Sequence, residues 1–572
     1  MTASLSDIDR LANSYFHQRL ALNPEEATSV GAPDADPGTW SDYSPEGCAA
    51  YTALAQETLT KLGTLKEQSP ADSVTAAALK ERLELDVELA HAGETVGVIN
   101  VIESPLQTIR DTFDMMPRAT AQDWDAIARR LASVHHAFAG YQQSLRARLQ
   151  GGPVIPARQV EQCIQQAERV ADPGTSPLSA LAEQAASFSL DSGVVVGTAT
   201  VEAQHAFGEF AQFLRTEIAA HTTSTDAVGR ERYARFSRLF LGSTIDLDET
   251  YQWGLDELAK IDAAQRRIAQ QLYGDGVSVR EALDRLNADP QYTIHGLDSL
   301  RTWMAQTASQ ALEAMNGAYF DIPAPMQRID TNVVANGTGG IYYTAPTQGF
   351  TRPGAMWWSV PAGSEDFHVW QERTTVFHEG VPGHHLQLGL AVYLDDELND
   401  WRRMGSWMSG HGEGWALYAE QLMAELGFHT DPASMMGVLD SMRLRAARVV
   451  VDLGVHLGKD AGTWGDGAWD HDSAWTFLRH NVAMDPAFLS FELDRYLGWP
   501  GQAPSYKIGQ RMWNDMRNDA RHRAEARGQD FDLKAWHMKA LSLGSLGLDV
   551  LRQALEEDDE TADHNPTAPK VA

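Results

Sequence analysis

The chain has 572 residues, of which 43% are hydrophobic and 22% charged, a composition typical of a globular protein with a large core. Its formal net charge of −32 argues against nucleic acid and against anionic membranes as partners, because both need clustered Lys and Arg. Two cysteines, Cys48 and Cys163, favour a cytoplasmic location with reduced thiols over a disulfide framework. We expect no membrane span and no secretory leader in Met1 to Leu20.

Helical periodicity dominates the first half of the chain. One apolar stripe runs from Trp124 to Leu145 and is opened by Thr120, with Asp123 three residues later. Such stripes are typical of helices that bury one face in a core. The sequence therefore predicts a mainly α protein, with its N-terminal helical part at about 1–330.

Strand signals are few. The best are residues 340–343 and 355–360, which are rich in aromatic residues and bounded by Gly and Pro. The first contains Tyr342 and Tyr343, which we predict either to contact a substrate or to support the residues of the site. Both segments precede the most chemically informative part of the chain, and they predict a small β-sheet beside it.

That part begins with His378 and Glu379, in the run His-Glu-Gly-Val-Pro-Gly-His-His. Neutral imidazole and carboxylate oxygen are ligands that zinc prefers. The usual second ligand stands four residues after the first, but here that position is Pro382. His385 would share a face of an ideal helix with His378, whereas His384 needs the break that a Pro-Gly pair favours. Spacing alone leaves both histidines open as the second ligand.

Glu413, in Glu-Gly-Trp-Ala-Leu-Tyr-Ala-Glu, is the predicted third ligand. Three protein ligands leave a position for water, so the set predicts one catalytic zinc ion per chain. Glu379 is then the general base, because it adjoins a ligand without sharing its helix face. Glu420, two turns after Glu413, either orients a ligand imidazole or is a solvated acid.

Further candidates follow along the chain. Asp452 and His456 are one helical turn apart, so His456 is a candidate donor to an oxyanion with Asp452 behind it, or the two form a simple polar pair. Tyr506 and Lys507 stand in a Gly- and Pro-rich segment that suggests an active-site loop. Tyr506 is predicted to stabilise the oxyanion, and Lys507 or Arg495 to bind a substrate carboxylate.

These motifs resemble a known family, the bacterial domain of unknown function 885. The resemblance rests on the segments 378–387 and 413–420, on Tyr342-Tyr343, and on 451–456, 500–509 and 531–534. It implies a largely helical, zincin-like metallopeptidase fold, similar to that of the thermostable carboxypeptidase Taq family. By analogy with dipeptidyl peptidases that have an expanded motif, His384 is the second ligand and His385 a neighbour of the substrate. Gly547 departs from the family pattern, which usually has Pro there.

We therefore expect a single helical unit over residues 1–555, with the metal site in about 331–555 and a disordered acidic tail over 556–572. The predicted function is zinc-dependent hydrolysis of peptide bonds, in short peptides, with a carboxypeptidase or dipeptidase as the nearest type. One alternative is a zinc amidohydrolase acting on a non-peptide amide. Another is a catalytically silent, metal-stabilised binding protein, although such sites usually have four protein ligands. The oligomeric state is left open, and a homodimer is compatible with the sequence.

Overall fold

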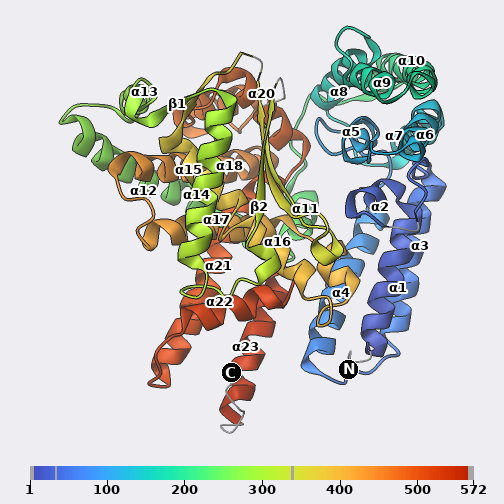
Figure 1. Cartoon of the computed structure of the whole chain (residues 1–572). Coiled ribbons are helices and arrows are strands. Elements are labelled where there is room, and N and C mark those ends of the chain that lie inside the picture. Colours follow the sequence, from blue (N-terminus) through green and yellow to red (C-terminus); the bar gives the residue numbers. More distant parts are fainter. Residues whose placement is uncertain (1–4, 33–34, 336–339, 362, 565–572) are drawn as a thin grey trace.

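A computed structural model describes residues 5–32, 35–335, 340–361 and 363–564. The chain is mainly helical, as predicted, with two small sheets (Figure 1). No helix among the described residues is long and apolar enough to cross a membrane. In Figure 1 helices α1–α4 stand beside the body that α12–α22 form, and α5–α10 lie at one end of them.

The helices of the first part have these bounds: α1 Asp7–Leu22, α2 Pro24–Val30, α3 Pro45–Leu62, α4 Pro70–His91, α5 Pro105–Met115, α6 Ala121–Ala132, α7 Val134–Gly151, α8 Ala157–Ala171, α9 Pro177–Phe188, α10 Leu190–Phe213 and α11 Arg230–Leu241. Several begin with the signal of a polar N-cap followed by Pro, as at Ser44-Pro45 and Ser69-Pro70. The side chain of the N-cap residue accepts a hydrogen bond from a backbone N–H group that has no helical partner. Pro has no N–H group, but the first helical position does not require one.

The stripe from Trp124 to Leu145 is divided between two helices. α6 ends before Ser133 and α7 begins after it, so the single stripe seen in the sequence spans two helices. Both halves still bury the stripe, together with α5 and α8–α10, in a core of their own. The hydrophobic pattern therefore predicted the buried face correctly but not the interruption at Ser133, whose hydroxyl bonds backbone carbonyls one turn earlier.

The second part begins with α12 and contains the strands. Its helices are α12 Leu247–Tyr273, α13 Val279–Asn287, α14 Leu297–Met315, α15 Val369–Glu379, α16 His384–Tyr393, α17 Ser409–Glu425, α18 Pro432–His456, α19 His471–Asn481, α20 Pro486–Gly498, α21 Gln502–Ala526, α22 Leu533–Ser542 and α23 Leu548–His564. Its strands are β1 Thr293–His295, β2 Ile329–Ala335, β3 Ile341–Thr344, β4 Gly354–Val360 and β5 Asp366–His368.

The predicted sheet is present beside the His-Glu helix. β4 is the middle strand, parallel to β2 and antiparallel to β3, with Tyr343 paired to Met356. Met356 is fully buried in one cluster with Val376 of α15, and the indole of Trp358 donates to Glu372 of the same helix. The sheet therefore packs directly on the helix that ends in His378 and Glu379.

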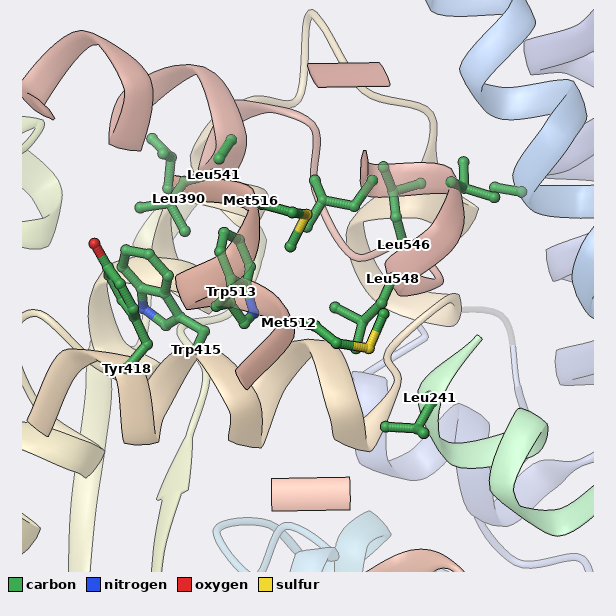
Figure 2. Close-up of a cluster of buried hydrophobic side chains, with 14 of the residues drawn as sticks. Leu241, Leu390, Trp415, Tyr418, Met512, Trp513, Met516, Leu541, Leu546 and Leu548 are labelled. Atoms are coloured by element: carbon green, nitrogen blue, oxygen red, sulfur yellow. The ribbon is translucent and has the colours of Figure 1, made fainter. Parts of the chain in front are cut away.

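A second core joins the two ends of the chain. It contains residues from Ala12 in α1 to Leu555 in α23. Figure 2 shows its centre, where aromatic and methionine side chains of α17 and α21 meet leucines of α16 and α22. The indole rings of Trp415 and Trp513 lie 5.0 Å apart in an edge-to-face arrangement. A core shared in this way is consistent with the single unit predicted over residues 1–555, which stays a prediction.

The acidic end of the chain differs from the prediction. Residues 556–564, expected to be disordered, continue α23 as far as His564, and the rest of the predicted tail lies outside the described residues. Glu is a good helix former, and the amide of Gln553 donates to Glu557 one turn later. The helix is anchored by Leu548, Leu551 and Leu555, which are buried.

Glycines allow α17 and α21 to approach closely. A Cβ atom added at Gly509 would lie 2.1 Å from the carbonyl oxygen of Gly410 and 2.9 Å from the Cα of Gly414. We expect Gly509→Ala to lower the free energy of unfolding by about 1–3 kcal/mol, because the helices must move apart. Gly197→Ala in α10 is the matched control, since nothing lies within 4 Å of its Cβ position. It should stabilise the protein by about 0.5–1 kcal/mol. Denaturant unfolding of both variants tests this, and an unchanged Gly509→Ala protein would contradict the packing argument.

Candidate metal centre

The chain breaks between the two candidate histidine ligands. α15 ends at Glu379 and α16 begins at His384, as the Pro-Gly pair predicts. Gly383 makes this break possible, because a Cβ atom there would lie 1.9 Å from the carbonyl oxygen of His378. Its amide donates to the carbonyl of Phe377 at 3.1 Å. The first turn of α16 is thereby held against the last turn of α15.

A side chain of α17 also stabilises the break between α15 and α16. Trp415 lies two residues after Glu413, and its indole Nε1 donates to the carbonyl oxygen of Pro382 at 2.8 Å. Trp415 is fully buried in the core of Figure 2. A rigid aromatic side chain therefore fixes Glu413 relative to the segment that connects the two histidines.

Three of the predicted residues meet at this junction. One potential ligand atom from each of His378, His384 and Glu413 lies within 4.8 Å of the other two. Glu413 Oε2 is 3.2 Å from Nε2 of His378 and 3.5 Å from Nε2 of His384. The two imidazole planes are perpendicular, with ring centroids 4.9 Å apart. Two imidazole nitrogens and one carboxylate oxygen thus converge on one point.

His385 points away from this group. Its Nε2 lies 2.8 Å from the carbonyl oxygen of Met326, so this nitrogen carries the proton and donates it. Its Nδ1 then accepts the hydroxyl proton of Tyr343 at 2.9 Å. Both nitrogens of His385 have protein partners, and the geometry therefore favours His384 as the second ligand.

Glu420 lies behind His378, as its position two turns after Glu413 suggested. Its Oε1 accepts from Nδ1 of His378 at 2.8 Å, and its Oε2 accepts from the hydroxyls of Thr374 and Ser441 at 2.6 and 2.9 Å. Glu420 is 1% exposed, which excludes the solvated-acid alternative. With its Nδ1 proton held by Glu420, His378 turns the lone pair of Nε2 toward the point of convergence.

The charges of this group fit a divalent cation. Among the described residues, none of the carboxylates of Glu379, Glu413 and Glu420 forms an ion pair with Lys or Arg. Burial lowers the pKa of His378, but hydrogen bonds that its imidazole donates to Glu413 and Glu420 outweigh this effect and raise the pKa to about 10. Without a bound cation, protons on the histidines or on the acids must neutralise the negative charge of these carboxylates. The donor set matches zinc, and Nδ1 of His384 has no protein partner within the described chain.

Glu379 adjoins the three converging side chains without contributing a ligand atom to them. It is the last residue of α15, is 5% exposed, and does not belong to the three converging atoms. Burial raises the pKa of its carboxyl group, and the nearby Glu413 and Glu420 add to this, while His378 and His384 oppose it. A buried carboxylate with a raised pKa is a better proton acceptor than one in water.

Tyr506 lies on α21, near the candidate ligand Glu413. The prediction of a loop here is wrong: Gly501 is the left-handed N-cap of α21, and residues 502–509 are helical. Pro504 is tolerated because the first turn of a helix has backbone N–H groups without helical partners. Burial raises the pKa of Tyr506, and the charge of Glu413 raises it further. The phenol therefore senses the charge of a candidate ligand and stands on a rigid element, and its role at the oxyanion stays a prediction.

Arg495 and Lys507 are both ion-paired within the protein. The guanidinium carbon of Arg495 lies 6.0 Å from the ring centroid of Tyr506. Lys507 points instead to Glu257, at 3.0 Å, and to the side-chain oxygen of Gln510, at 2.8 Å. Arg495 is paired as well: Nη1 lies 2.9 Å from Glu492, and Nη2 donates to the side-chain oxygen of Gln502 at 2.6 Å. Binding of a substrate carboxylate by either cation stays a prediction.

Asp452 and His456 form separate contacts. Oδ1 of Asp452 accepts from the hydroxyl of Tyr233 at 2.7 Å and from the amide of Gly501 at 3.0 Å. Nε2 of His456 lies 3.0 Å from the carbonyl oxygen of Tyr496, and burial lowers its pKa to about 4. These contacts join α11, α18 and the start of α21. They favour a role in positioning α21 over the predicted role of His456 at the oxyanion.

Tyr342 and Tyr343 lie on β3 and face different surroundings. Tyr342 is 49% exposed and stacks on Trp357, with ring planes 7° apart. Tyr343 bonds His385, and burial, with the charge of Glu379 as a smaller contribution, raises the pKa of its hydroxyl. Only Tyr343 therefore adjoins the candidate centre, and contact of Tyr342 with a substrate stays a prediction.

The chain is similar to one protein family and to two solved structures. The family model "Bacterial protein of unknown function (DUF885)" matches residues 24–555. The chain belongs to this family. Two solved structures share its fold. "The crystal structure of the putative lipoprotein from Colwellia psychrerythraea" is 20% identical with a TM-score of 0.80, and the match covers 97% of this chain and 99% of that one. "The structure of a putative lipoprotein of unknown function from Shewanella oneidensis" is 16% identical with a TM-score of 0.72, and the match covers 96% of this chain and 100% of that one. No curated protein matches.

Some supporting residues of this DUF885 member escaped the sequence analysis. Thr374 precedes His378 by one helical turn, so helical spacing alone places it on the same face as His378, where it meets Glu420. Ser441 lies on α18 and reaches Glu420 because that helix packs on α15 and α17, and Arg448 of the same helix reaches the ring of Tyr506. Nothing in their sequence positions signals this contact.

The contact between Glu420 and His378 generates a prediction for metal affinity. Glu420→Gln should weaken zinc binding by about 10–100-fold, because a neutral amide oxygen accepts the Nδ1 proton of His378 more weakly than a carboxylate does. Glu425→Gln, on the same helix but paired with Arg517, is the control and should leave zinc affinity unchanged. Competition with a chelating dye measures both. Equal zinc affinities of wild type and Glu420→Gln would show that Glu420 does not support the centre.

Proposed function

We propose that this protein is a zinc-dependent peptidase that hydrolyses peptide bonds in short peptides. The observation that carries the proposal is the convergence of His378, His384 and Glu413, with a further acid, the buried Glu379, beside them but outside the set. Three ligands plus an uncommitted acid are typical of catalytic sites, whereas structural zinc sites usually have four protein ligands.

The candidate ligands hold one zinc ion in this proposal. Zinc bound there supplies Lewis-acid polarisation and makes water acidic enough to act as a nucleophile near neutral pH. His378 and His384 offer neutral imidazole nitrogens, and Glu413 offers one carboxylate oxygen. Glu420 keeps His378 in the tautomer that ligation requires.

Glu379 moves the protons. It takes one from the attacking water and returns it to the amine that leaves, so the same carboxylate serves both halves of the reaction. Its burial and raised pKa suit this cycle, because a group that must both accept and donate works best when its pKa approaches the working pH.

Tyr506 and Tyr343 flank the reacting atoms in this proposal. Tyr506 has its pKa raised in part by Glu413, and Tyr343 by Glu379, so each phenol lies close to one side of the centre. The hydroxyl of Tyr343 donates to His385, which leaves its oxygen free to accept from a substrate N–H. Tyr506 is the better candidate to donate to a developing oxyanion.

Two wider interpretations belong to the same proposal. The likeness to zincin-like peptidases and to the thermostable carboxypeptidase Taq family rests on the motifs and on the helix-plus-sheet setting of the centre. The cytoplasmic location rests on cysteine usage alone, and the lipoprotein names of the two similar structures count against it.

Metal content tests the ligand set. Purified wild-type protein should contain one zinc ion per chain, and His378→Ala should lose it, because two remaining ligands bind zinc weakly. His385→Ala is the matched control, since both its nitrogens already have protein partners. It should keep stoichiometric zinc by elemental analysis. Loss of zinc from His385→Ala with retention in His378→Ala or His384→Ala would overturn the assignment.

Turnover tests the role of Glu379. In a screen of dipeptides and tripeptides, Glu379→Gln should keep its zinc and slow hydrolysis by about 10²- to 10⁴-fold, because an amide cannot accept the proton of water. Undiminished hydrolysis would show that the reaction needs no base at this position. Zinc-loaded wild type that cleaves simple amides but no peptide would favour the amidohydrolase alternative, and one that cleaves neither would favour a binding protein.

A further inference from the structure

A buried hydrogen bond links α16 to α17 next to the candidate ligands. The side-chain Nε2 of Gln387, on α16, donates to Nδ1 of His411, on α17, at 3.1 Å. Gln387 lies one helical turn after His384. His411 lies two residues before Glu413. Gln387 is 4% exposed and His411 is 1% exposed, so the bond lies inside the protein. Neither residue contributes a ligand atom to the three that converge.

A second contact joins the same region on the other side of the ligands. The bond between Trp415 and Pro382 follows Glu413 on α17 and precedes the start of α16. The bond between Gln387 and His411 has the reverse order, because it follows the start of α16 and precedes Glu413. A single contact between two helices is a pivot, whereas two contacts on opposite sides of the ligands prevent rotation about it. Together the two bonds fix the orientation of α16 relative to α17.

His411 also contacts the helix that carries Tyr506. Its carbonyl oxygen accepts from the indole Nε1 of Trp513, on α21, at 3.1 Å, and the centroids of the two rings lie 5.4 Å apart. Trp513 stands two turns after Tyr506 and is fully buried in the core of Figure 2. Three helices therefore meet at His411, and they carry His384, Glu413 and Tyr506.

The same contact leaves two buried polar atoms without a protein partner. Because Nδ1 of His411 accepts, its Nε2 carries the proton, and this nitrogen has no partner among the described residues. The side-chain oxygen of Gln387 has none there either. A buried polar pair with an unmatched donor and an unmatched acceptor contributes less to folding than apolar side chains of the same shape. Polar groups placed at such a cost are typical of functional sites.

We propose that Gln387 and His411 are positioning residues of the metal centre, whose hydrogen bond sets how the two ligand helices face each other. This inference rests on the proposed function and deepens it, because both residues act through the ligands and not on the substrate. An imidazole and a carboxylate bind one zinc ion tightly only when their lone pairs point to one position. Rotation of α16 against α17 would turn His384 away from Glu413.

Apolar replacement of both residues tests the proposal on the full chain. Gln387→Met/His411→Phe keeps similar buried volumes and removes the hydrogen bond. Zinc affinity, measured by competition with a chelating dye, should fall by about 10–100-fold. The metal-free double variant should melt at the temperature of the metal-free wild type or above it, because two unmatched polar atoms are removed. A structural role would instead lower the melting temperature.

Cobalt(II) and turnover give two further measurements. The visible absorption bands of bound cobalt(II) depend on the number and geometry of its ligands, so the bands of the double variant should differ from those of the wild type. At saturating zinc, kcat for the best peptide should fall by about 10-fold or more while KM changes little, because the displaced ligands affect the chemical step.

Two further variants sharpen the comparison. His411→Asn can accept from Gln387 through its side-chain oxygen, so it should restore most of the zinc affinity. Gln204→Met is the matched control, because Gln204 is a buried glutamine that bonds Ser179 in the separate core of α5–α10. It should bind zinc like the wild type. Should the double variant fail to fold, Gln387→Met alone removes the donor and should show the same loss of affinity and the same change in the cobalt bands.

The outcomes separate this inference from the proposed function. Wild-type zinc affinity, cobalt bands and kcat in the double variant would overturn the positioning role and leave the peptidase intact. A loss of zinc affinity that is matched by a lower melting temperature of the metal-free protein, or that His411→Asn shares in full, would also overturn it. Zinc binding by the wild type without hydrolysis of any peptide would overturn the peptidase, while affinity and cobalt bands still decide the positioning role. A wild type that binds no zinc would overturn both.

Discussion

The hydrogen bond from the indole of Trp415 to the carbonyl of Pro382, with the close approach of Gly383 to the carbonyl of His378, joins the two motifs of this chain. It holds the end of α15, the start of α16 and the middle of α17 at one point. His378, His384 and Glu413 converge only because these three segments are fixed there. The helical core of Figure 2 supplies the rigidity, since Trp415 is buried at its centre.

Buried charge is the second constraint on this part of the molecule. Acids dominate on one side of Tyr506, where Glu379, Glu413 and Glu420 surround two histidines. On its other side two guanidinium groups share one carboxylate. A cation on the first side would offset the negative charge of the three carboxylates. The two guanidinium groups on the second side already have partners in Glu492 and in the side-chain oxygen of Gln502.

Helix packing sets the distance between these two sides. α17 carries Glu413 and α21 carries Tyr506, and glycines at 410, 414 and 509 bring the two helices into backbone contact. Asp452 of α18 holds the amide of Gly501 and so fixes where α21 begins. Residues outside the centre therefore determine its dimensions, and the close packing of helix backbones makes those dimensions hard to vary.

The sequence by itself determined the helical class, the sheet before His378, and the residue types of the centre, because periodicity, Pro-Gly breaks and ligand chemistry are local properties. Helical spacing also predicted that Glu420 shares a face with Glu413, but it left the role of Glu420 open. Only the tertiary structure favours His384 over His385, since the preference depends on what Met326 and Tyr343 offer to His385. It likewise placed Tyr506 in a helix and paired Arg448 with Glu492 of another helix. Contacts between helices far apart in sequence are set by packing, which no local pattern records.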